Sequence, residues 1–219
     1  MANEMSTGAF IRTTSFFTLI SLAVVTIASW LSYGWAVNGW LDLLLFIVGV
    51  VMIFVFTGSD NPVISFIGVN GLAGIVGLIV GPCLKMYSAD GILTAAILSL
   101  LTVAVFSVLG IIFGAFFRGI GGIIIGALNL LVIVVFGQAI LAAFGLISPY
   151  NFWISAGAIV VFMGVTAYDW AIALAGPLTL DKAIDTSGGL MLDVVNIFLR
   201  ILEILGNSSS SSSSSLLDD

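Results

Sequence analysis

Two aspartates lie in stretches of the chain that otherwise carry almost no charge. Asp169 lies within the apolar stretch 156–177, and Asp193 stands near the start of the last apolar stretch, 188–206. A carboxylate at bilayer depth costs about 2.5–3.5 kcal/mol on insertion scales, so an ionisable residue there is a candidate for function. These two side chains are therefore the first candidates for chemistry in the chain.

The chemistry open to the two aspartates depends on how near they are to each other. Two adjacent carboxylates do not comfortably both ionise, so they share a proton and titrate as one unit. After losing that proton they repel each other or attract a hard cation such as Ca2+, which prefers oxygen ligands. Two carboxylates are too few for a tight site, so Asp169 and Asp193 predict a weak and transient Ca2+ site.

The last apolar stretch carries its polar residues at helical spacing. Asp193, Asn196, Arg200 and Glu203 follow one another by three, four and three positions. At about 100° per residue they share one narrow side of an α-helix, and Arg200 can pair with Glu203 one turn further on. We interpret this polar stripe as a hydrophilic path or switch. A helix lying on the membrane surface, or a polar seam that only joins helices, would produce the same pattern.

The preceding stretch places Asp169 on one helix face with Ser155, Phe162 and Thr166. Only a short loop joins this stretch to the last one, so we expect the two helices to be neighbours. Both aspartates then lie toward the loop end of the hairpin and can approach each other. The alternative interpretation is that Asp169 lies near enough to its helix end to reach water.

The composition predicts an integral membrane protein. Of 219 residues, 61% are hydrophobic and 7% are charged, and the mean hydropathy is +1.30, whereas soluble domains carry about 25% charged residues. The chain has no histidine and a single cysteine, Cys83, which excludes imidazole sites and an internal disulfide. The apolar composition makes the lipid bilayer the expected partner. The chain has no basic patch, so we expect no nucleic acid as a partner.

Seven stretches are long enough to cross a bilayer, for which about 20 apolar residues are needed. Glycine, proline and polar residues separate them, and the only sizeable loop is 178–187. The serine-rich segment 207–219 has too little apolar content to order itself. We therefore predict an all-α membrane protein, a seven-transmembrane-helix bundle that forms a single domain over residues 1–206, followed by a disordered tail. The spans are 13–37, 40–57, 62–82, 91–117, 120–144, 151–176 and 188–206.

Glycines recur at the spacing that allows helix backbones to approach closely. We interpret these pairs as packing contacts inside the bundle, namely Gly77 with Gly81, Gly110 with Gly114, and Gly122 with Gly126.

Few charges set the orientation in the membrane. With the N-terminus inside, Arg12, Arg118 and Lys182 lie inside and Lys85 lies outside. The positive-inside rule therefore favours an inner N-terminus and, with seven spans, an outer C-terminus.

The residues around both aspartates resemble one family of membrane proteins. Residues 168–169 read Tyr-Asp in the sixth span, and residues 190–198 read Leu-Met-Leu-Asp-Val-Val-Asn-Ile-Phe in the seventh. This pattern resembles the Bax inhibitor (TMBIM) family, whose members carry Tyr-Asp or Phe-Asp in the sixth helix and Leu-x-Leu-Asp-x-x-Asn-x-Phe in the last. Segment 61–82 also looks like the third helix of that family, and the resemblance extends from Phe10 to Gly206.

The resemblance implies a seven-helix protein of bacterial type, in the bacterial inner (plasma) membrane. Members of the family are associated with pH-sensitive calcium leak and, in eukaryotes, with suppression of cell death. Some bacterial members are linked to a membrane-bound AAA protease. The pH sensor of the family is a pair of aspartates at the positions of Asp169 and Asp193.

This chain departs from the family pattern in two places. Bacterial relatives often carry arginines just after the second helix, whereas residues 58–61 include no basic residue. Family members often carry a glutamine shortly after the sixth-helix aspartate, and residues 170–173 have none. Arg118 or Arg200 is then a possible counter-charge for the aspartate pair.

We therefore expect a pH-sensitive calcium leak channel gated by Asp169 and Asp193, with no enzymatic activity and no resident cofactor. The first alternative is a membrane interaction protein that modulates a membrane-bound AAA protease or a cell-death or stress response. The remote alternative is an intramembrane aspartyl protease, which also pairs a Tyr-Asp with an aspartate on the next helix. In those proteases the second aspartate follows Gly-x-Gly, whereas Asp193 follows Leu-Met-Leu, and the chain lacks a Pro-Ala-Leu segment.

Overall fold

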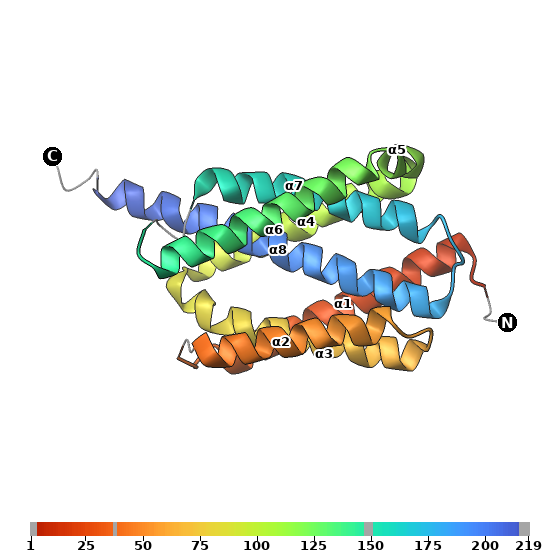
Figure 1. Ribbon diagram of the computed structural model, residues 1–219, viewed down its shortest axis with the longest axis horizontal. Helices are drawn as coiled ribbons and strands as arrows, with labels where there is room; N and C mark the ends of the chain where they lie inside the picture. The colour runs from red at the N-terminus through yellow and green to blue at the C-terminus, as the bar shows by residue number, and fades with distance from the viewer. Residues whose placement is uncertain (1–3, 37–38, 147–150, 215–219) are drawn as a thin grey trace. The chain divides into compact units, whose positions relative to one another are not determined.

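The computed structural model describes residues 4–36, 39–146 and 151–214, and most of them are helical (Figure 1). These residues contain no β-strand, which confirms the predicted all-α fold. In chain order the helices are α1 (Thr7–Ser32), α2 (Gly39–Thr57), α3 (Pro62–Cys83), the short 3-10 helix η1 (Leu84–Met86), α4 (Ala89–Ile112), α5 (Gly114–Gly119), α6 (Gly121–Ala143), α7 (Phe152–Ala173) and α8 (Leu180–Ser214).

Six of the described helices are long and apolar enough to cross a membrane, namely α1, α2, α3 together with η1, α4, α6 and α7. They correspond to the first six predicted spans. Helix α8, which carries the polar stripe, is not in this set, so the seventh membrane span stays a prediction. The predicted end of the first span, residue 37, lies outside the described residues.

Polar side chains mark the starts of several helices. Ser6 Oγ accepts a hydrogen bond from the Ala9 N–H at 3.3 Å, and Asn61 Oδ1 accepts one from the Val63 N–H at 3.0 Å. Ser88 Oγ does the same for the Gly91 N–H at 3.1 Å. Each bond satisfies a backbone donor that has no partner inside its own helix, which explains why the helices begin where they do.

Two predicted helix boundaries are wrong. The fourth span was predicted as one helix over 91–117, but α4 ends at Ile112 and the separate helix α5 begins at Gly114. The last helix begins at Leu180 instead of residue 188, because Thr179 caps it by accepting a hydrogen bond from the Lys182 N–H at 3.2 Å. It also continues to Ser214, since serine does not stop a helix. Residues 215–219 of the predicted tail lie outside the described residues, and the disorder of segment 207–219 stays a prediction.

The chain divides into two compact units. The first comprises Met1–Met86 and Ala173–Leu192, and the second comprises Tyr87–Ile172 and Asp193–Asp219. Helix α8 therefore contributes its first part to one unit and its remainder to the other. The single domain over residues 1–206 stays a prediction.

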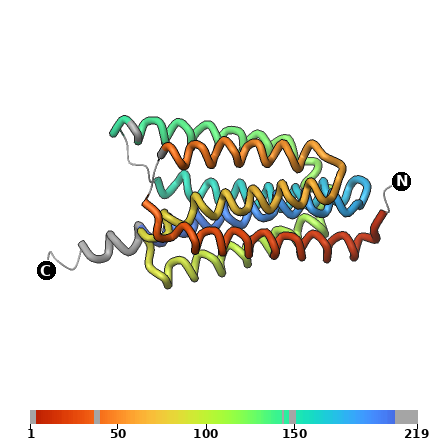
Figure 2. Tube along the Cα trace, turned by 90° about the horizontal axis from the view of Figure 1, so that it is seen from below, coloured from red at the N-terminus to blue at the C-terminus, as the bar shows by residue number. Residues whose placement is uncertain are grey.

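In the first unit, α3 packs against both α1 and α2, and Figure 2 shows it running between them. Glycines allow this close approach. A methyl group added at Gly77 would overlap the Val25 carbonyl on α1, and one at Gly68 would lie 2.8 Å from the Phe56 Cβ on α2. Ser32 on α1 also donates a hydrogen bond to the Gly77 carbonyl at 3.3 Å. The predicted packing role of the pair Gly77 and Gly81 is confirmed, since Gly81 also meets α1.

In the second unit the two remaining glycine pairs behave differently. Gly110 and Gly114 both face α7, which confirms their predicted packing role. A methyl group added at Gly122 or Gly126 would meet no atom of the described residues within 4 Å. The prediction for this third pair is wrong, because both glycines lie on an open side of α6.

Large apolar side chains are exposed on the helices of both units. Trp30 is 77% exposed, Phe54 72%, Ile123 73% and Trp153 80%. Exposed apolar surface of this extent is unfavourable in water and is expected where helices contact lipid. The exposed faces therefore agree with the membrane location that the composition predicts.

Candidate functional site

The candidate site lies where α7 meets the second part of α8. Thr166 Oγ1 donates a hydrogen bond to Asp193 Oδ2 at 2.9 Å, and Ser155 Oγ donates one to Glu203 Oε2 at 2.7 Å. The later residue of α7 contacts the earlier residue of α8, so the two helices are antiparallel here. This arrangement is the helical hairpin that the short connecting loop predicts.

The two aspartates lie near each other at this contact. Asp193 is only 3% exposed, and Asp169 is partly buried one helical turn beyond Thr166. Their carboxyl groups are close enough to interact electrostatically. The structure therefore places both predicted site residues together, while their role as a pH sensor stays a prediction.

Thr166 has two hydrogen-bond acceptors within reach. Its Oγ1 lies 2.9 Å from Asp193 Oδ2 and also 2.9 Å from the Phe162 carbonyl oxygen. A hydroxyl carries one proton and can donate to only one acceptor at a time. The Thr166 hydroxyl therefore donates to the ionised Asp193, or it donates to Phe162 and accepts a proton from the protonated Asp193.

Trp170 lies on the same side of α7 as Thr166, one turn further along. The residue is 2% exposed, and its buried indole N–H has no hydrogen-bond acceptor among the described residues. A buried donor without a partner is energetically unfavourable. The helix therefore carries an unsatisfied polar group directly beside Asp169.

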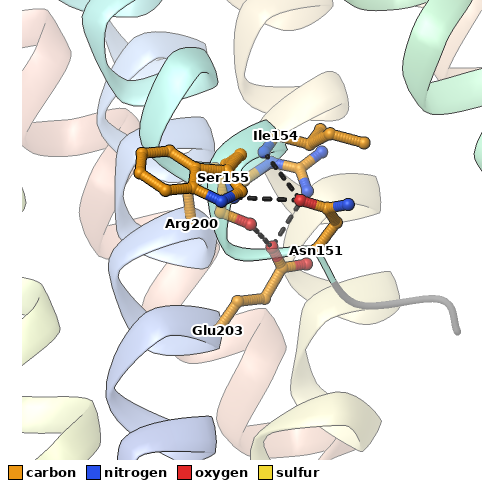
Figure 3. A network of polar contacts seen from close by, with 6 residues as sticks. Asn151, Ile154, Ser155, Arg200 and Glu203 are labelled. Atoms are coloured by element: carbon orange, nitrogen blue, oxygen red, sulfur yellow. Dashed lines mark hydrogen bonds and ion pairs between the residues drawn. The ribbon is translucent and has the colours of Figure 1, made fainter.

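A second polar network joins α7 and α8 toward the start of α7 (Figure 3). Glu203 Oε2 accepts the Ser155 hydrogen bond and also forms a 2.9 Å ion pair with Arg200 Nη1. Asn151 Oδ1 caps α7 by accepting from the backbone N–H groups of Trp153 and Ile154, at 3.0 and 3.3 Å. The pairing of Arg200 with Glu203 that their spacing allows is present, and Asn196 is partly buried between the two networks along α8.

Arg118, a possible counter-charge, makes its described contact with backbone. Its Nη1 donates a hydrogen bond to the Ala171 carbonyl at 3.1 Å. Ala171 lies two residues after Asp169, near the end of α7. The guanidinium is thus attached to the helix turn that carries Asp169, and sequence reasoning missed this contact because a backbone carbonyl leaves no signature in the sequence.

The structure also brings together acidic residues that the sequence analysis assigned to a loop. In the first unit, Ser65 Oγ donates a hydrogen bond to Asp181 Oδ1 at 2.7 Å, and Asp185 follows one helical turn later. Asp185 precedes the predicted seventh span. Burial, followed by the negative charges of Asp181 and Asp60, raises the pKa of Asp185 to about 7, and the Ser65 hydroxyl acts in the opposite direction.

The described residues do not assemble enough ligands for a stable metal site. Within the described ranges, no group of three or more cysteine or carboxylate side chains is placed to hold a metal ion. Asp169 and Asp193 together supply two carboxylates, whereas stable Ca2+ sites use about six to eight oxygen ligands. Weak and transient Ca2+ binding by the pair stays a prediction.

Fold and site together define an all-α integral membrane protein with a pair of acidic residues on two adjoining helices. A family model described as "Inhibitor of apoptosis-promoting Bax1" matches residues 7–210. The chain belongs to this family, the Bax inhibitor family, as the residues around Asp169 and Asp193 predicted. A comparison with curated proteins gives no match.

Proposed function

We propose that this protein is a pH-sensitive cation leak channel, with calcium as the transported ion, gated by Asp169 and Asp193. The observation that carries the proposal is the burial of Asp193 against α7, where it interacts with the Asp169 carboxyl and accepts a hydrogen bond from Thr166. The bacterial inner membrane is the location that we propose for this activity.

In the closed state the two carboxyl groups share one proton. When the shared proton is on Asp193, that residue donates to Thr166, and Thr166 donates to the Phe162 carbonyl, so that both hydroxyl groups are satisfied. The shared proton also removes one of the two like charges. Helices α7 and α8 are then held together at this level.

Loss of the shared proton opens the pathway. Two ionised carboxylates repel each other across the interface between α7 and α8. A calcium ion relieves that repulsion by binding to both, and two ligands hold it weakly enough for it to leave again. Toward the start of α7, Glu203 and Arg200 line the same side of α8 and continue the hydrophilic path.

The test is calcium flux into proteoliposomes that contain an internal calcium indicator, with the pH equal on both sides and the membrane potential clamped. We expect the wild-type flux to rise from mildly acidic to mildly alkaline pH. Asp169→Asn and Asp193→Asn each remove one of the two titrating groups, so both variants should lose this pH response.

A matched control is Asp90→Asn, because Asp90 is an exposed aspartate in the first turn of α4. It should retain both the flux and its pH response. Unchanged flux and unchanged pH response in both Asp169→Asn and Asp193→Asn would refute the channel proposal.

A further inference from the structure

The turn of α7 that carries Asp169 is attached to the connection between α4 and α6. We call residues 110–121 the corner; it includes the end of α4, the whole of α5 and the start of α6. Arg118 in the corner donates a hydrogen bond to the Ala171 carbonyl at 3.1 Å. Ala171 lies in the last turn of α7. The carbonyl groups of this turn have no N–H donor within the helix, so a side-chain donor stabilises this end.

Three glycines of the corner contact the same turn. A methyl group added at Gly110 would overlap the backbone of Ala167, and one at Gly121 would overlap the ring of Tyr168. At Gly114 the added methyl would lie 3.7 Å from the Cα of Ala171. The corner therefore approaches α7 closely before and after Asp169, at distances that only glycine allows at two of these positions.

These contacts lie on the side of α7 away from the aspartate pair. At about 100° per residue, Ala167, Ala171 and Tyr168 lie at about 100°, 140° and 200° around the helix from Thr166. Asp169 lies at about 300° on the same scale, close to Thr166 and nearly opposite the middle of the contact face. The corner thus supports α7 from behind while Thr166 and Asp169 face Asp193.

We propose that the corner is a clamp that sets the position of Asp169 relative to Asp193, and that Arg118 is its positioning residue. This inference rests on the proposed function only in taking the two aspartates as one titrating unit. The clamp keeps the α7 turn against α8, and releasing it lets the carboxyl groups separate and admits water between them.

Charged or titratable side chains near Asp169 come from α8, from α5 and from α7 itself. Asp193 faces it from α8, Arg118 approaches its turn from α5, and Tyr168 precedes it on α7. The sequence of α6 has no charged residue, and Asp90 is the only one in α4, at the opposite end of that helix. A change in the titration of the pair after an uncharged substitution in the corner, such as Gly121→Ala, therefore reports on the position of the α7 turn.

The test measures protonation directly, without ion flux. Infrared difference spectra of the full-length protein in lipid follow the band of the protonated aspartate carboxyl as a function of pH, and Asp193→Asn identifies the band. Gly121→Ala and Gly122→Ala add the same methyl group at adjacent positions, one against Tyr168 and one into open space. Arg118→Met removes the donor, and Arg118→Lys retains both a charge and a donor.

We expect Gly121→Ala to lose the band at a pH lower by roughly half a unit, about a threefold change in the ionisation equilibrium. Separated and hydrated carboxyl groups ionise more readily, which sets this direction. Arg118→Met should also lose the band at a lower pH, by a smaller amount, because removal of the positive charge acts in the opposite direction. Gly122→Ala and Arg118→Lys should match the wild type. Equal behaviour of Gly121→Ala and Gly122→Ala, or an unchanged titration in Arg118→Met, would overturn the clamp. Absence of calcium flux would refute the channel and leave this measurement intact.

Discussion

Thr166 is the residue that joins Asp193 to α7, and its hydroxyl can be removed without changing the shape of the side chain. Thr166→Val would leave the Asp193 carboxyl buried without this hydrogen bond. Leaving a buried polar group unsatisfied destabilises a protein by about 1–3 kcal/mol. We therefore expect Thr166→Val to lower the free energy of unfolding by about that amount, measured by denaturant titration of the purified protein in detergent.

Thr166→Ser is the matched control for this prediction, because it retains the hydroxyl and loses one methyl group. It should lie closer to the wild type than Thr166→Val does. Equal stability of wild type and Thr166→Val would show that the hydrogen bond to Asp193 contributes nothing to the fold.

At the residue scale, helical spacing was sufficient to find the groups that lie on α7 and α8. It placed Thr166 with Asp169, because residues three or four positions apart share a helix face. It linked Asp193 to Glu203 through Asn196 and Arg200, which follow at the same spacing. It could not pair Ser155 with Glu203, since that contact depends on the register between two helices. Nor could it find the partner of Arg118, which is a backbone carbonyl.

At the element scale, the packing of α1 against α3 depends on Gly77. A methyl group at this position would overlap the Val25 carbonyl, so Gly77→Ala forces the two helices apart. Overpacking of this kind typically destabilises a protein by about 1–3 kcal/mol. We expect a loss of that order for Gly77→Ala, measured as a decrease in the free energy of unfolding in detergent.

Gly126→Ala is the control, because its added methyl group meets no atom within 4 Å. Alanine also favours helix over glycine by up to about 1 kcal/mol, so this variant should be neutral or slightly more stable. A comparable loss of stability in both variants would contradict the packing argument.

The start of α8 introduces a pH dependence through Asp185. Its pKa in the folded protein is raised to about 7, above the value of about 3.9 expected in the unfolded chain. Between these two values the folded state binds more protons than the unfolded state, so stability falls as the pH rises. We expect the melting temperature in detergent to fall from about pH 4 to about pH 8, and to fall less steeply in Asp185→Asn.

Asp90→Asn serves again as the exposed control and should follow the wild-type curve. Other carboxyl groups also contribute to the wild-type slope, so the difference between wild type and Asp185→Asn is the informative quantity. Parallel curves for these two proteins would show that Asp185 does not titrate in this environment.

The helix boundaries show where sequence patterns are informative and where they are not. Asn61 before Pro62 and Ser88 before α4 are recognisable start signals, and the helices begin there. The interruption at Phe113 was missed because the residues on both sides are apolar, and an apolar run of 27 residues gives no sign of a turn. The early start of α8 was missed because polar residues were taken as loop, although Thr179 is a good helix cap.

At the scale of the whole molecule, the membrane topology depends on α8. If α8 crosses the bilayer, the seven spans place the two termini on opposite sides, with the N-terminus inside by the distribution of Arg and Lys. Two reporters fused separately after Asp219 should then both indicate an outside location: alkaline phosphatase should be active, and green fluorescent protein should not fluoresce. The opposite pair of results would place the C-terminus inside. Together with a fluorescent green fluorescent protein fused before the N-terminus, which would place that end inside as well, it would contradict the seventh span.

Trp170 can serve as an intrinsic fluorescent probe of the interior around α7. The buried indole of Trp170 lies next in sequence to Asp169, whereas Trp30, Trp35, Trp40 and Trp153 are exposed. Replacing those four by phenylalanine leaves a single tryptophan, which can be excited selectively and whose emission shifts to longer wavelength when water reaches it. Hydration of the interior can therefore be followed optically, in real time, without attaching a dye.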